Sequence, residues 1–125
     1  MIKWISILIV LLLGFAFIIN NRQDEGYRVI TPLDAKTKLE DKSVILLDVR
    51  TMEEYRQAHI PGSILIPVDE LQGKIEDKFP NKEQGIIIYC RSGNRSKTAA
   101  NMLLKMGYKN VYDLGGIINW PYEVE

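Results

Sequence analysis

The chain has 125 residues, a formal net charge of +0 and one cysteine, which together exclude several classes of protein. Its length suits one domain, and 46% hydrophobic with 26% charged residues is the composition of a globular rather than a disordered chain. Mixed charges without a basic excess argue against nucleic-acid binding, and a lone cysteine without clustered histidines excludes an internal disulfide and argues against a zinc site.

The N-terminal segment is strongly apolar, because no charged residue occurs between Lys3 and Arg22. This length is near the lower bound of about 17 residues for a membrane-spanning helix, and Trp4 stands where an interfacial aromatic residue is expected. We expect residues 1–22 to form a single-pass transmembrane anchor or signal anchor. A cleaved signal peptide is the second interpretation, although no clear small-x-small cleavage site follows, and a buried core helix is the third.

The charges that flank this segment indicate its orientation only weakly. Lys3 precedes it, whereas Arg22 and Arg28 follow it among acidic residues. A short N-terminus before an uncleaved span usually stays in the cytoplasm, so we expect the rest of the chain on the extracytoplasmic side of the cell membrane. Residues 23–26 are the predicted linker, and residues 27–125 the predicted folded domain.

From residue 27 onward, short apolar runs alternate with segments of helical spacing. We expect strands over 27–30, 44–49, 63–66, 86–89 and 111–114, and helices over 31–40, 51–58, 69–78, 96–106 and 117–120. Thr31 before Pro32, and Thr51 three residues before Glu54, are predicted helix N-caps. This alternation predicts an α/β fold with a mostly parallel sheet and right-handed crossovers.

The most informative stretch joins a strand, the cysteine, a short loop and a helix. Residues 86–89 are apolar and run into Cys90, and Gly93 permits a tight turn before the helical pattern. Ligands bind beyond the carboxyl ends of parallel strands, and a helix start offers unpaired N–H groups and the positive end of a dipole. This position favours Cys90 as a thiolate, the nucleophilic form, and Arg91 and Arg95 add positive charge beside it.

The loop over residues 90–96 resembles the active-site loop of the rhodanese family of sulfurtransferases. Other parts of the chain match the family's pattern in order and spacing, namely residues 46–50, 53–55, 59–63, 107–108, 114–117 and 120. The resemblance covers roughly residues 27–125, about the size of one domain. It implies a three-layer fold whose central five-stranded sheet holds the cysteine strand in its middle.

The resemblance also implies a chemistry, which is the transfer of a sulfane sulfur through a persulfide. Cys90 is then the catalytic nucleophile, and the predicted substrate-binding residues are Arg91, Ser92, Gly93, Asn94, Arg95 and Ser96. The partners are a small anionic donor such as thiosulfate and an acceptor that is cyanide, a thiol or a protein thiol, and neither a metal nor an organic cofactor is needed. Plainer interpretations stay open, since the polar side chains also suit helix capping and the arginines also suit a solvated loop.

Three further residues are predicted to support the site structurally. Asp48 and Arg50 follow a buried strand, where a buried carboxylate requires hydrogen bonds from loop N–H groups or from an arginine. His59 is the only histidine and precedes a Pro-Gly turn, which favours a structural role. The alternative for His59 is that of a general base in a Cys–His pair.

Two other functions compete with sulfur transfer. Cysteine phosphatases have five residues between cysteine and arginine, whereas four separate Cys90 from Arg95, so the shorter loop has less room for a tetrahedral phosphate. The second alternative is a non-enzymatic, membrane-tethered rhodanese-like module that binds a partner or takes part in a redox relay. Retention of the cysteine and of both arginines favours the enzyme.

Overall fold

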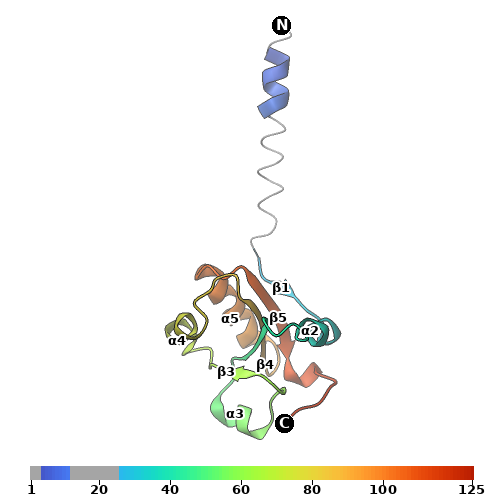
Figure 1. Cartoon of the computed structure of the whole chain (residues 1–125), viewed down its shortest axis with the longest axis vertical. Coiled ribbons are helices and arrows are strands. Elements are labelled where there is room, and N and C mark those ends of the chain that lie inside the picture. The colour runs from blue at the N-terminus through green and yellow to red at the C-terminus, as the bar shows by residue number, and fades with distance from the viewer. Residues whose placement is uncertain (1–3, 12–25) are drawn as a thin grey trace.

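A computed structural model describes residues 4–11, which form a helix, and residues 26–125, which form the folded domain. The strands of the domain are β1 (Arg28–Val29), β2 (Ile45–Asp48), β3 (Ile64–Leu65), β4 (Gly85–Cys90) and β5 (Asn110–Gly116). Its helices are α2 (Pro32–Lys38), α3 (Met52–Gln57), α4 (Leu71–Lys78), α5 (Asn94–Lys105) and the short 3₁₀ helix η2 (Ile117–Asn119) (Figure 1).

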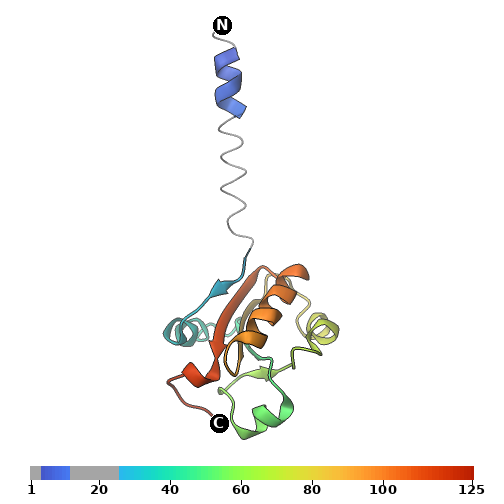
Figure 2. The same ribbon diagram turned by 180° about the vertical axis from the view of Figure 1, so that it is seen from behind.

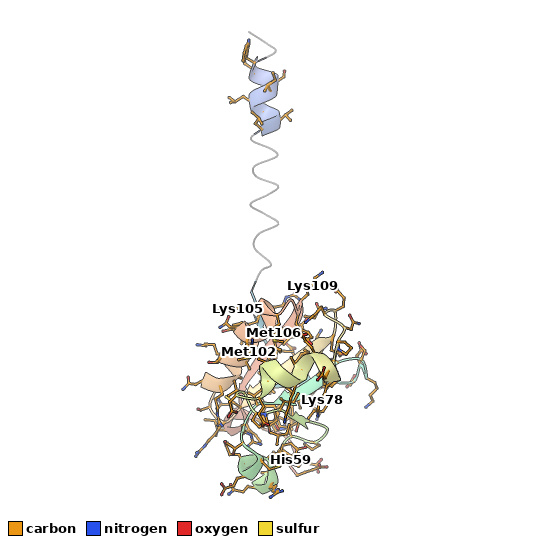
Figure 3. All side chains as sticks on the ribbon, turned by 90° about the vertical axis from the view of Figure 1, so that its left-hand side faces the viewer. His59, Lys78, Met102, Lys105, Met106 and Lys109 are labelled. Carbon is orange, nitrogen blue, oxygen red and sulfur yellow. The ribbon has the colours of Figure 1, made fainter. Side chains whose placement is uncertain are left out.

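The five strands form one parallel sheet in the order β1-β5-β4-β2-β3, which confirms the predicted α/β fold. β4 lies in the middle, between β5 and β2, as the resemblance implied. Because all strands run in one direction, their carboxyl ends meet at one end of the domain. Figure 3 shows His59, which follows α3, at this end, and Lys105 and Lys109 toward the other.

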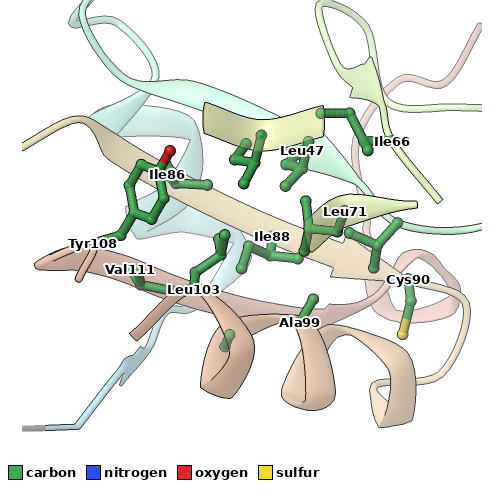
Figure 4. Close-up of a cluster of buried hydrophobic side chains, with 13 residues drawn as sticks. Leu47, Ile66, Leu71, Ile86, Ile88, Cys90, Ala99, Leu103, Tyr108 and Val111 are labelled. Atoms are coloured by element: carbon green, nitrogen blue, oxygen red, sulfur yellow. The ribbon is translucent and has the colours of Figure 1, made fainter. Parts of the chain in front are cut away.

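Helices cover both faces of the sheet and make three layers (Figures 1 and 2). Side chains alternate along β4, so Ile88 packs with α4 and α5 on one face, while Ile87 packs with α2 on the other. The first cluster also contains Cys90, which lies two residues after Ile88 on the same face (Figure 4). The cysteine therefore belongs to the layer that α5 covers.

The predicted helix caps are present. The Thr31 hydroxyl accepts a hydrogen bond from the Asp34 N–H at 3.1 Å, and Pro32 occupies the first turn of α2. At α3, the Thr51 hydroxyl accepts from the Glu54 N–H, and the Glu54 carboxylate accepts from the Thr51 N–H, both at 3.2 Å. This reciprocal capping box fixes where α3 begins.

Most predicted boundaries are shifted by one or two residues, and two of these differences lie beside the cysteine. α5 begins at Asn94 rather than Ser96, because Gly93 has a φ of 111° and turns the chain at once into the helix. β5 continues through Gly116, where a turn was expected. A Cβ atom there would lie 2.3 Å from the Arg91 carbonyl oxygen, so only glycine lets β5 pass this close to the cysteine loop.

The predicted membrane anchor falls largely outside the described residues. Of residues 1–22, the structure describes 4–11, whose side chains are exposed. Among the described residues, no helix combines the length and apolar character needed to cross a bilayer. The anchor over 1–22 and the linker over 23–26 stay predictions.

Candidate active site

Cys90 is the last residue of the central strand, and its residue exposure is 1%. Figure 4 shows its sulfur pointing away from the other labelled side chains of the cluster. The Gly93 N–H donates a hydrogen bond to this sulfur at 3.0 Å. The geometry therefore stabilises charge on the sulfur, which a cysteine serving only as a small core residue does not require.

The loop that follows Cys90 is fixed by the start of α5 and by a hydrogen bond from Ser96. Gly93 is the N-cap of the 12-residue helix α5 and makes no side-chain cap, so the positive end of the helix dipole lies beside the sulfur. The buried Ser96 hydroxyl donates to the Gly93 carbonyl at 3.1 Å, so it fixes the loop and is not directed at a substrate. Ser92 and Asn94 are exposed and make no side-chain hydrogen bond within the described part of the chain.

Arg95 is paired with a residue that the sequence did not suggest as part of the site. It donates to both carboxylate oxygens of Glu54, at 2.6 and 2.9 Å. Hydrogen bonding from Arg95 lowers the pKa of Glu54 from 4.5 to about 2. Hydrogen bonding to Glu54 also raises the pKa of Arg95, and negative charge at Cys90 and Asp48 acts in the same direction.

Arg91 differs from Arg95 because it is exposed and has no ion pair among residues 4–11 and 26–125. Its backbone carbonyl accepts a hydrogen bond from the Ile118 N–H at 3.3 Å. Its side chain borders a groove of about 500 Å³ between α3 and the C-terminal segment. The groove is lined by Arg50, Glu54, Gln57, Ala58, Arg91, Ile117, Ile118, Trp120, Tyr122 and Val124.

The C-terminal segment over residues 117–124 therefore contributes to the site, which the sequence did not predict. The ring of Trp120 meets the ring of Tyr122 edge-on, with centroids 4.9 Å apart. Both rings also line the groove. Backbone hydrogen bonds of 2.9 and 2.8 Å join Glu125 to His59, so the end of the chain lies beside α3 (Figure 1).

Asp48 and Arg50 form a buried ion pair of 2.7 Å, as their proposed structural role requires. Arg50 also donates to the Ala58 carbonyl at 2.7 Å, and its own N–H donates to Asp48 at 2.9 Å. The pair thus ties the end of β2 to the end of α3. Both of its charges are satisfied within the protein, which suits a support rather than an acid–base pair.

The His59 ring is held by Tyr55 and Glu125. Its ring stacks on Tyr55 with centroids 3.8 Å apart, and Nδ1 lies 2.9 Å from the Tyr55 carbonyl oxygen. Nε2 lies 3.5 Å from the Glu125 carboxylate. Because these contacts occupy both ring nitrogens, they favour the structural role over a Cys–His pair.

Tyr89, which precedes Cys90, joins the cysteine strand to the turn after His59. Burial raises the pKa of Tyr89, so its hydroxyl stays protonated. The hydroxyl donates to the Ser63 hydroxyl and accepts from the Ile60 N–H, both at 3.1 Å. Among the described residues, no group of three or more His, Cys, Asp or Glu side chains is placed to hold a metal ion.

Comparison with known families and proteins identifies the same region. The rhodanese-like domain model matches residues 31–122. The thiosulfate sulfurtransferase PspE of Escherichia coli is 38% identical over 71 residues, which cover 57% of this chain and 68% of PspE. Bacillus subtilis YrkF is 41% identical over 86 residues, which cover 68% of this chain and 45% of YrkF. The matched region is thus less than half the length of YrkF and about two thirds that of PspE.

Solved structures show the same fold. A rhodanese from Escherichia coli, solved with anions, has 33% identity and a TM-score of 0.61, and the match covers 65% of this chain and 95% of that one. A rhodanese-related protein from Thermoplasma volcanium has 33% identity and a TM-score of 0.68, and the match covers 79% of this chain and 98% of that one. The predicted site residues in 90–96 lie inside the family match.

Proposed function

This chain belongs to the rhodanese-like domain family and is a sulfurtransferase of the rhodanese type, and we propose that it transfers sulfane sulfur through a persulfide on Cys90. The proposed donor is a small anion such as thiosulfate, and the acceptor is cyanide, a thiol or a protein thiol. One observation carries the proposal, which is the Gly93 N–H aimed at the Cys90 sulfur at 3.0 Å from the start of α5.

The reaction takes place in two displacements. The Cys90 thiolate attacks the outer sulfur of thiosulfate, a new S–S bond forms, the donor's S–S bond breaks, and sulfite leaves with the electron pair. The acceptor then attacks the outer sulfur of the persulfide, and Cys90 leaves as a thiolate. The product is thiocyanate from cyanide or a persulfide from a thiol, and no electrons are exchanged with an outside reagent.

The surroundings of Cys90 stabilise the charge that moves during these steps. The Gly93 amide and the dipole of α5 favour negative charge on the sulfur, first as thiolate and then as persulfide. Arg91 is the free cation for the donor, while Arg95 supplies a charge already shared with Glu54. The exposure of Ser92 and Asn94 supports their assignment as contacts of the donor, and Ser96 holds the loop.

The burial of Cys90 adds one requirement to this mechanism. With an exposure of 1%, the sulfur meets a donor only when the loop over residues 91–93 moves away from it. The side chains of this loop are exposed or half-buried, so the opening has to strain mainly hydrogen bonds, among them those that the Gly93 carbonyl accepts from the Ser96 hydroxyl and the Lys97 N–H.

A substitution of the cysteine tests the proposed function. We expect the full-length Cys90→Ser protein to form no thiocyanate from thiosulfate and cyanide above the uncatalysed rate, because serine has no nucleophilic sulfur. Urea unfolding of the variant shows whether the fold is kept. Thiocyanate formation at the wild-type rate by Cys90→Ser would overturn the role of Cys90.

We also propose that residues 1–22 anchor the protein in the cell membrane as a single pass, with residues 27–125 on the extracytoplasmic side. The uncharged run between Lys3 and Arg22 and the helix over 4–11 support this placement. Carbonate extraction of membranes and protease treatment of spheroplasts test it. Release of the full-length protein by carbonate, or protection from added protease, would contradict the placement.

A further inference from the structure

The groove between α3 and the C-terminal segment has a composition that the transfer of sulfur to cyanide does not explain. Resting on the proposed function, we propose that this groove is the acceptor site and takes a small organic thiol of one class. The thiol carries an apolar chain and has a carboxylate next to the sulfur-bearing carbon. Such an acceptor is a 2-mercaptoalkanoate or a molecule of the same chemistry.

The apolar part of the proposal rests on the C-terminal wall of the groove. That wall consists of Ile117, Ile118, Trp120, Tyr122 and Val124. Ile118 is 64% exposed and Val124 is 48% exposed, so both present apolar surface to solvent at the rim. A volume of about 500 Å³ is in the range of small-molecule sites, and burying these side chains against a ligand removes apolar surface from water.

The anionic part of the proposal rests on the charges of the same groove. Arg50 is neutralised by Asp48, and Glu54 is neutralised by Arg95. Arg91 is the one charged residue of the lining that has no ion pair in the described part of the chain. The groove therefore has a single uncompensated positive charge, which suits a ligand with one negative charge.

The position of Arg91 determines where that charge belongs on the ligand. Arg91 follows Cys90 directly, and its carbonyl accepts the N–H of Ile118. Arg91 thus joins the reactive cysteine, its neighbour in the chain, to the groove that the apolar wall lines. A ligand that meets all three at once has its thiol and carboxylate close together and its apolar chain leading away from them.

The transfer step on such an acceptor is balanced without another reagent. The thiol releases its proton to solvent, and the thiolate attacks the outer sulfur of the Cys90 persulfide. A bond forms between the acceptor sulfur and the outer sulfur, the bond to Cys90 breaks, and Cys90 leaves as a thiolate. The product is the persulfide of the acceptor.

A series of acceptors of increasing chain length tests the proposal on the full-length protein. The protein is first loaded with thiosulfate, and its intact mass shows the added sulfur. The rate at which 2-mercaptopropionate, 2-mercaptobutanoate and 2-mercaptohexanoate remove that sulfur is then measured against concentration. We expect KM to fall by up to about fourfold for each added methylene, as expected for burial of a methylene group. The uncharged 2-mercaptohexanamide should have a higher KM than the acid.

Two variants separate the groove from the rest of the surface. Ile118→Ser should flatten the dependence of KM on chain length. Leu33→Ser is the matched control, because Leu33 is also 64% exposed but lies on α2 outside the groove lining, and it should leave the dependence unchanged.

The outcomes distinguish this inference from the proposed function. A protein that never gains sulfur from thiosulfate overturns both proposals. A protein that gains sulfur but reacts with short and long acids at one KM overturns the acceptor site alone, which is the result expected if the acceptor is a protein thiol. An equal loss of chain-length dependence in Ile118→Ser and Leu33→Ser also overturns the acceptor site.

Discussion

Gly116 gives the strictest test of how the cysteine loop is positioned. Its backbone has an ordinary extended conformation, with φ −103° and ψ 139°, so alanine is not excluded by backbone strain. What excludes alanine is the neighbouring loop, since a Cβ atom would lie 2.3 Å from the Arg91 carbonyl oxygen and 2.7 Å from the Ser92 Cα. Gly116→Ala therefore pushes directly on the backbone that carries the Gly93 N–H.

The size of the effect follows from these distances. Ordinary van der Waals contact begins at 3.4 Å, so the loop and β5 have to separate by 3.4 − 2.3 = 1.1 Å. A misplacement of about 1 Å at a reacting group costs about 100-fold in rate, and overpacking costs about 1–3 kcal/mol of stability. We expect thiocyanate formation by Gly116→Ala to fall by about 100-fold while the protein still folds.

Gly73→Ala is the matched control, because a Cβ atom at Gly73 in α4 meets nothing within 4 Å. This variant should keep its activity and gain about 0.5–1 kcal/mol in the free energy of unfolding, since alanine is the better helix former. Thiosulfate-to-cyanide turnover and urea unfolding are measured for both variants. Full activity in Gly116→Ala would refute the argument that β5 holds the cysteine loop in place.

Three other substitutions test separate parts of the site. Because the pKa of Glu54 is lowered from 4.5 to about 2, its pair with Arg95 stabilises the fold above about pH 4.5 and loses this effect as the pH falls toward 2. As the pH falls across this range, the free energy of unfolding measured in urea should drop by about 1–2 kcal/mol more in the wild type than in Glu54→Gln, a value that allows for the partial exposure of the pair. An equal drop in the two proteins would contradict the stabilising effect of the pair. Asp48→Asn leaves the charge of Arg50 buried without its partner and should lower the free energy of unfolding by about 3–5 kcal/mol; a loss under about 1 kcal/mol would show that the pair is not needed. Gly93→Ala imposes a φ of 111° on alanine, so it should cost about 1–3 kcal/mol and most of the thiocyanate formation, and an unchanged rate would rule out the Gly93 amide as a positioning group.

Local patterns were sufficient to predict most of the elements. Short continuous apolar runs indicated the strands, and the cap at Thr31 and the capping box at Thr51 involve residues three apart, which a sequence shows directly. The same holds for the order of strand, cysteine, loop and helix. These features depend on neighbours along the chain, so they are visible before folding.

The remaining parts of the site depend on residues that are distant in sequence. Glu54 and Arg95 are 41 positions apart, and Glu54 already had a sufficient role in the capping box, so nothing suggested its second partner. The approach of Gly116 to Arg91 depends on the pairing of β5 with β4. The C-terminal wall of the groove depends on how the chain returns toward α3 after η2. Composition carries no signal for such contacts.

Intact mass after exposure to thiosulfate tests the proposed role of Cys90 most directly. The wild-type protein should gain the mass of one sulfur atom, and that gain should disappear when cyanide is added. Cys90→Ser, treated in the same way, should gain nothing. A wild-type protein that never takes up sulfur, or a Cys90→Ser protein that takes up as much, would contradict the persulfide on Cys90.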